Sequence, residues 1–235
     1  MWQALGWGAL AASSLLIGAV LGVARRWHQG FIGVVLGFGA GALISSISFE
    51  LAAEGFAKGG ALPLAGGLAA GALVFYFADR VVQRLGSRLG GGSAGLPLAL
   101  GALLDGIPEQ AVLGLGLAQG QGVSIALLVA IFVSNLPESI GSSTDMRAAG
   151  ESPGRVLSLW AVVGFACTLA TLGGYAISQV TADRFEAAID GFAAGALLVM
   201  LVGSMIPEAT EKAQDKAGLA AVLGFAVAAG LSALS

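Results

Sequence analysis

The stretch 94–118, AGLPLALGALLDGIPEQAVLGLGLA, is long and apolar enough to cross a bilayer, yet it carries Pro108-Glu109 within it. A proline inside a helix removes one backbone hydrogen bond, and a carboxylate at the bilayer centre costs about 2.5–3.5 kcal/mol on insertion scales. The same pattern of an apolar residue before Pro-Glu recurs as Leu136-Pro137-Glu138 and Ile206-Pro207-Glu208. Such unfavourable groups in a membrane segment indicate a functional site.

The overall composition predicts a membrane protein. Hydrophobic residues make up 57% of the 235 residues and charged residues only 11%, with a mean hydropathy of +0.88. The 38 glycines suit close helix packing in lipid. A single cysteine, Cys167, argues against a disulfide framework and a cysteine zinc cluster. The net charge of -3, without basic runs, argues against a nucleic-acid partner.

Charged and turn residues divide the chain into eight apolar spans of about 18–25 residues each. We therefore expect an all-α polytopic membrane protein in which residues 1–235 form one transmembrane domain. The spans are expected near 3–23, 31–53, 61–78, 94–118, 122–143, 156–179, 187–209 and 217–234.

The basic residues predict the orientation of the chain. Arg25-Arg26 follow the first span and no positive charge precedes it, so we expect this span to be retained with its N-terminus external. Of the eleven basic residues, all except Lys58 and Arg184 then lie on the cytoplasmic side, which agrees with the positive-inside rule. An even number of spans leaves both termini external.

The fourth and fifth spans hold carboxylates but no basic residue. Between Arg88 and Arg147 the chain has no Lys, Arg or His. The acids in that interval are Asp105, Glu109, Glu138 and Asp145. They must be protonated, hydrogen-bonded, paired with a base from another span or bound to a cation. The other spans offer no central base either, which favours a bound cation.

The spacing of these residues brings them onto shared helix faces. Asp105 and Glu109 are four residues apart, as are Ser134 and Glu138, and Asn135 adjoins the second pair. The proline before each glutamate frees a backbone carbonyl beside these side chains. The two spans are joined by a short turn, so we expect an inverted pair of Pro-kinked helices that face one site near the bilayer midplane, as in transporters.

Further polar residues extend toward the two ends of the predicted bundle. Glu50 and Glu54 are four residues apart near the external end of the second span, and Glu208 lies near the cytoplasmic end of the seventh. Together with Ser134, these residues are expected to line a pathway to the site.

These features resemble the ZIP (Zrt/Irt-like) family of divalent metal transporters, as a divergent bacterial-type member. The fourth-span motif of that family is similar to Asp105-Gly106-Ile107-Pro108-Glu109-Gln110, and its fifth-span motif to Ser134-Asn135-Leu136-Pro137-Glu138-Ser139. The run 39–46 resembles the second span of the family, and Met205-Ile206-Pro207-Glu208 resembles the seventh. The likeness covers nearly the whole chain and implies a ZIP-like bundle of eight spans with external termini.

The resemblance also implies a ligand set and a function. Asp105, Glu109, Asn135 and Glu138 match the family's metal-binding positions. They would bind a divalent metal ion of the zinc, manganese or iron class as the transported substrate. The family implies import across a cell membrane, which would be the inner membrane in a prokaryote, by a homodimer surrounded by lipid. No resident cofactor and no enzymatic activity are expected.

Several positions depart from the family pattern. Asp105 stands where the family commonly has His, and Gly106 where it has Asn. Gly203-Ser204 replace a His-Glu pair in the seventh span, and Ala170-Thr171 replace Glu-Pro in the sixth. The family's binuclear centre is thereby reduced to one carboxylate site, and its histidine-rich loop is missing. Carboxylate oxygens suit harder ions such as manganese, magnesium or calcium better than imidazole does.

Alternative interpretations remain open. In one alternative to metal binding, Glu109 and Glu138 are protonated and donate hydrogen bonds between helices, and Asp105 is a structural residue. In the same view Glu208 is a solvated helix end, Glu54 a boundary residue and Asn135 a packing contact. The chain itself would then be a proton-coupled carrier of another solute, or a metal sensor that transports nothing. An intramembrane aspartyl protease is disfavoured, because Asp105 has no clear aspartate partner in mid-membrane and no Gly-x-Gly-Asp context.

Overall fold

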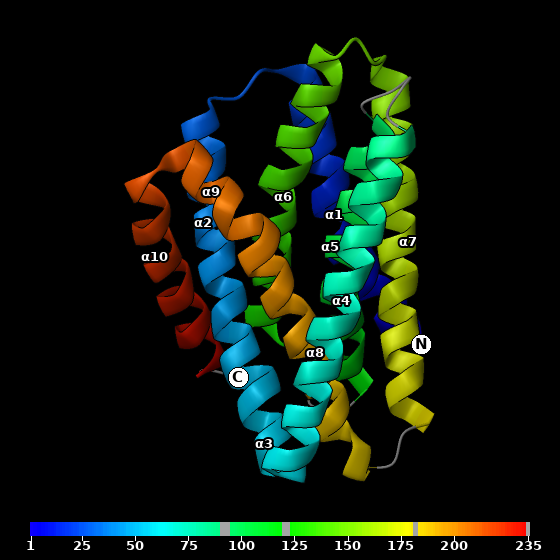
Figure 1. The fold of residues 1–235 in the computed structure, drawn as a ribbon, viewed down its shortest axis with the longest axis vertical. Coiled ribbons are helices and arrows are strands. Elements are labelled where there is room, and N and C mark those ends of the chain that lie inside the picture. The colour runs from blue at the N-terminus through cyan, green and yellow to red at the C-terminus, as the bar shows by residue number, and fades with distance from the viewer. Residues whose placement is uncertain (90–94, 119–122, 181–182, 234–235) are drawn as a thin grey trace.

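The computed structural model is a bundle of long helices (Figure 1). It describes residues 1–89, 95–118, 123–180 and 183–233. The elements within those residues are α1 (Trp2–Ala24), α2 (Gln29–Ser46), η1 (Ile47–Ala53), α3 (Glu54–Gly59), α4 (Ala61–Leu89), α5 (Gly95–Ala118), α6 (Ile125–Ala148), α7 (Pro153–Val180), α8 (Asp183–Met200), η2 (Leu201–Met205), α9 (Ile206–Ala213) and α10 (Asp215–Ser232). The all-α prediction is confirmed for the described residues.

Each span expected from the sequence falls on a helix or on a run of consecutive helices. Among the described residues, seven helical segments are long and apolar enough to cross a membrane: α1, α2 through α3, α4, α6, α7, α8 through α9, and α10. Helix α5 matches the remaining predicted span, and its described part carries Asp105, Glu109 and Gln110, which lower its hydropathy. The chain is a multi-pass membrane protein.

Local backbone geometry ends several of these helices. Gly60 between α3 and α4 and Gly150 between α6 and α7 have φ values of 79° and 93°, which glycine adopts readily. Gln214 separates α9 from α10 with a φ of 51°. At the start of α6, Ser124 Oγ accepts a hydrogen bond from the Leu127 N–H at 3.1 Å. These turns allow consecutive helices to reverse direction.

Two π-helical segments lie within the bundle and have no signature in the hydropathy pattern. η1 joins α2 to α3, and η2 joins α8 to α9. The helices that follow them, α3 and α9, extend the two spans beyond their predicted ends, to Gly59 and to Ala213 respectively. A π-helical turn widens the helix, and such turns are often found at functional sites.

Glycines bring pairs of helices into backbone contact. A Cβ at Gly71 of α4 would collide with the carbonyl of Phe192 in α8, and a Cβ at Gly195 of α8 would collide with that of Leu68 in α4. Comparable two-way contacts join α2 to α10 and α5 to α7. Close approach of this kind increases van der Waals contact where lipid provides no hydrophobic driving force.

The two helices with internal prolines, α5 and α6, run in opposite directions (Figure 1). They have few contacts with each other: α5 packs mainly against α7, and α6 mainly against α1 and α2. The turn expected between them, 119–122, lies outside the described residues. The described ends of the chain lie toward the same end of the bundle. What α5 and α6 share is a cavity between them.

Candidate functional site

An acidic cavity of about 170 Å³ lies among α2, α5, α6 and the run from α8 to α9. Its lining residues are Leu36, Gly101, Ala102, Asp105, Glu109, Glu138, Ser142, Met200, Ser204, Met205 and Glu208. One water molecule takes up about 30 Å³ in the liquid, so the cavity has room for an ion with part of its hydration shell. The polar side chains come from four separate helical elements.

Four carboxylates line this cavity. Asp105 and Glu109 lie one turn apart on α5, Glu138 lies on α6 and Glu208 on α9. Glu109 is only 2% exposed. These groups are near enough to interact electrostatically. Asp105 acts on Glu109, and Glu138 is affected by each of the other three carboxylates. Because like charges repel strongly where water is scarce, the arrangement favours the binding of a cation.

Serine hydroxyls hold two of the carboxylates. Ser204 Oγ, in η2, donates to Asp105 Oδ2 at 3.3 Å. Ser134 Oγ donates to Glu109 Oε1 at 3.2 Å and lies 3.4 Å from Oε2. An ionised carboxyl offers about four lone-pair positions, so both groups retain sites for a further ligand.

Asn135 is the predicted ligand that does not line the cavity. It is buried, with 1% of its surface exposed, and follows Ser134 on α6. Its amide is close enough to act on the Glu109 carboxyl, but its Nδ2 has no hydrogen-bond partner of normal geometry among the described residues. The structure thus brings three of the four predicted ligands to one cavity and leaves Asn135 beside them.

Two predicted pathway residues lie away from the cavity. Glu50 is part of η1, and its Oε1 accepts a hydrogen bond of 2.6 Å from Ser124 Oγ at the start of α6. Glu54 forms an ion pair of 3.4 Å with Lys58. Neither residue lines the acidic cavity. By contrast Ser134 contacts Glu109 directly, and Glu208 is one of the lining residues.

A basic side chain that the sequence did not lead us to expect lies beside the site. Lys212 Nζ lies 2.6 Å from Glu208 Oε1, and its side chain is only 16% exposed. Lys212 is not a central base, but α9 carries the seventh span past its predicted end at 209 to Ala213, and this places Lys212 beside the cavity. The four-residue interval between Glu208 and Lys212 was the available signal.

The carboxylates surround the cavity without forming a ready chelate. Among the described residues, no three His, Cys, Asp or Glu side chains lie close enough together to hold one metal ion. In this arrangement an ion would contact at most two of the carboxylates at once. Hydroxyl or water oxygens would have to complete its coordination.

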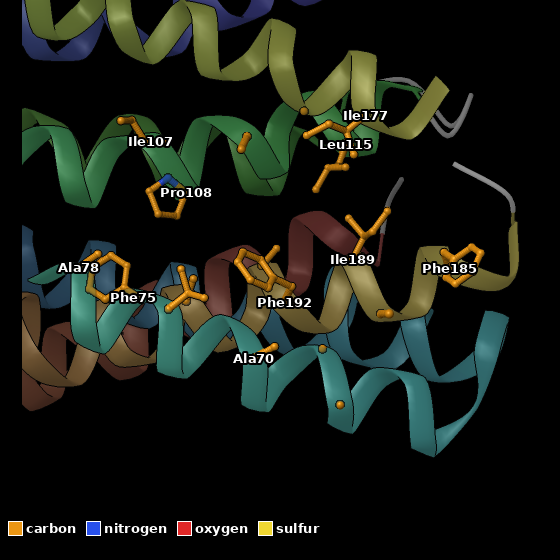
Figure 2. Close-up of a pocket in the computed structure, with 18 of the residues that line it drawn as sticks. Ala70, Phe75, Ala78, Ile107, Pro108, Leu115, Ile177, Phe185, Ile189 and Phe192 are labelled. Atoms are coloured by element: carbon orange, nitrogen blue, oxygen red, sulfur yellow. The ribbon is translucent and has the colours of Figure 1, made fainter. Parts of the chain in front are cut away.

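A second, larger cavity of about 730 Å³ lies between α4 and α8 on one side and α5 and α7 on the other. Figure 2 shows Pro108 on one side of it and Phe75 and Phe192 on the other. Its lining is made of apolar side chains and glycines, which offer no ligand to an ion. Leu104 and Pro108 thus face an apolar cavity from the same helix that presents Asp105 to the acidic one.

The sequence is similar to that of a protein from Arabidopsis thaliana that is named as a candidate zinc transporter. The two are 28% identical over 212 residues, which represent 86% of this chain and 34% of the plant protein. The chain therefore spans about a third of the length of the curated relative that it matches. A comparison with models of known protein families finds no match.

Proposed function

We propose that this chain is a ZIP-like transmembrane carrier of a divalent metal ion, which binds in the acidic cavity between α5, α6 and α9. The observation that carries the proposal is the convergence of Asp105, Glu109, Glu138 and Glu208 on one cavity inside a bundle of membrane-spanning helices. Carboxylates at such a position are unfavourable unless they serve an ion or proton path. The plant relative, named for zinc transport, supports metal ions as the cargo.

The charge of the cavity suits a dication. Four ionised carboxylates and the Lys212 ammonium sum to a formal charge of −3, that is, −4 from the acids and +1 from the base. A bound divalent ion would reduce this to −1. The loaded site is then closer to neutral, so it moves past hydrocarbon at a lower electrostatic cost.

The incomplete chelate suits transport better than storage. A cation held by at most two carboxylates, with Ser142, Ser204 or water supplying further oxygens, is bound loosely enough to leave. Oxygen ligands of this kind accept manganese, iron or zinc, and the harder ions magnesium and calcium. The family resemblance favours import across a cell membrane by a homodimer, without enzymatic activity or a resident cofactor.

The test is uptake by purified protein in proteoliposomes. Zinc, manganese, ferrous iron, cadmium, magnesium and calcium are offered separately to wild type, to Glu109→Gln and to Asp145→Asn. Asp145 is an exposed acid on α6 that does not line the cavity, so it is the matched control. We expect saturable uptake of at least one metal, reduced at least about tenfold in Glu109→Gln and unchanged in the control.

Two outcomes would contradict the proposal. Uptake by Glu109→Gln at the wild-type rate would remove the acidic cavity from the transport path. Failure of wild type to take up any metal would favour a sensor or a carrier of another solute. A proton flux measured without metal would then separate those two alternatives.

A further inference from the structure

Lys212 occupies a slot between α2 and α6 that two glycines leave open. A Cβ at Gly33 of α2 would lie 2.7 Å from Lys212 Cβ, and a Cβ at Gly141 of α6 would lie 3.1 Å from Lys212 Nζ. The stem of the lysine therefore passes one glycine and its ammonium group rests against the other. Side chains at either position would crowd this path.

The end of the slot is the acidic cavity. The ammonium contacts Glu208, which lines the cavity, and Gly141 lies one helical turn from Glu138, which lines it too. Lys212 also acts electrostatically on Glu138. The Lys212 ammonium group is thus a covalently attached cation that lies beside the carboxylates to which the transported metal ion would bind.

We propose that Lys212 is the internal counter-cation of this site: it neutralises Glu208 when no metal is bound and competes with the metal ion for that carboxylate. The inference rests on the proposed function. A metal ion that takes Glu208 as a ligand must share this carboxylate with the ammonium group that lies 2.6 Å from Oε1, or displace that group. Lys212 therefore weakens metal binding and favours release of the cargo.

A structural role would have a different signature. A salt bridge that merely stabilised α9 would affect the melting temperature and leave metal affinity unchanged. A competing cation sets the affinity itself, because a fixed positive charge near the site raises the free energy of a bound dication. Metal affinity is therefore the decisive readout.

The experiment measures binding of Zn²⁺ and Mn²⁺ alone, by calorimetry on the full chain in detergent, together with uptake in proteoliposomes. The variants are Lys212→Gln, Lys212→Arg and the control Lys216→Gln, whose lysine is exposed on α10. We expect Lys212→Gln to bind metal about tenfold more tightly, which corresponds to about 1.4 kcal/mol, and to turn over more slowly. Lys212→Arg keeps the charge and should stay within about threefold of wild type, and Lys216→Gln should match wild type.

Unchanged or weaker binding by Lys212→Gln, beside a wild type that binds and transports metal, would overturn the inference and leave the proposed function intact. If Lys212→Gln does not fold, Lys212→Met replaces it, because methionine keeps an unbranched side chain in the slot and removes the charge. A rise in the affinity of that variant supports the inference, and an unchanged affinity overturns it. If wild type neither binds nor transports any metal, the proposed function fails and the inference fails with it.

Discussion

Replacing Glu109 by glutamine should stabilise the metal-free protein and greatly reduce the stabilisation that metal provides. The Glu109 side chain is 2% exposed, and it interacts electrostatically with the carboxyl groups of Asp105 and Glu138. Glutamine keeps an oxygen that can accept the Ser134 hydrogen bond but removes one negative charge. Coulomb's law at an effective dielectric constant of about 20 gives about 2 kcal/mol for two like unit charges about 8 Å apart.

The expected gain is therefore about 2 kcal/mol in the free energy of unfolding. For a chain of this size, each kcal/mol moves the melting temperature by about 2–4 °C, so metal-free Glu109→Gln should melt about 4–8 °C above wild type. At a metal concentration of about 100 times Kd, wild type should gain about 2.7 kcal/mol, and the variant should gain far less.

Intrinsic fluorescence in detergent is a suitable assay, because Trp160 is fully buried and reports on unfolding. Melting curves are recorded with and without metal for wild type, Glu109→Gln and the exposed control Asp145→Asn. The control should follow wild type in both conditions. If Glu109→Gln melts at the wild-type temperature and is stabilised equally by metal, Glu109 is a neutral hydrogen-bonding residue and the ligand assignment is refuted.

Two further predictions concern Asp105, which lines the acidic cavity, and Ser124, which does not. Asp105→His introduces an imidazole ligand and should raise the uptake of zinc relative to manganese on the order of tenfold in a competition assay; an unchanged ratio would count against Asp105 as a ligand. Ser124→Ala removes the cap of α6 and the donor to Glu50, and should lower stability by about 1–2 kcal/mol in thermal melts without changing metal affinity. A loss of affinity in that variant would instead connect Glu50 to the transport path.

The spans were predictable because membrane thickness acts on each segment separately. The expected span 3–23 is one residue shorter at each end than α1 (Trp2–Ala24). The expected span 94–118 begins one residue before α5 (Gly95–Ala118) and ends at the same residue. A backbone in lipid must satisfy its hydrogen bonds within the helix, so hydropathy and length alone delimit such a segment. The clustering of Asp105 with Glu109 also follows from helical spacing on one element.

The position of Lys212 between two other helices could not be predicted from the sequence. From hydropathy its segment belongs to the cytoplasmic loop, since the predicted seventh span ends at 209. Helix α9 instead continues to Ala213, and the glycines at 33 and 141 leave room for the lysine between two other helices. The sequence around Lys212 does not predict a slot between α2 and α6, because the helices that form it are far apart in the chain.

The sequence by itself determined a multi-pass helical protein with unpaired carboxylates in its fourth and fifth spans, because hydrophobicity, helical periodicity and the scarcity of basic residues are properties of single segments. Only the tertiary structure decided which of those groups meet. It placed Glu208 with Asp105, Glu109 and Glu138 around one cavity, and left Asn135 outside its lining. The physical reason is that helix rotation and depth are set by packing between distant segments, chiefly through glycine contacts that a one-dimensional pattern does not pair.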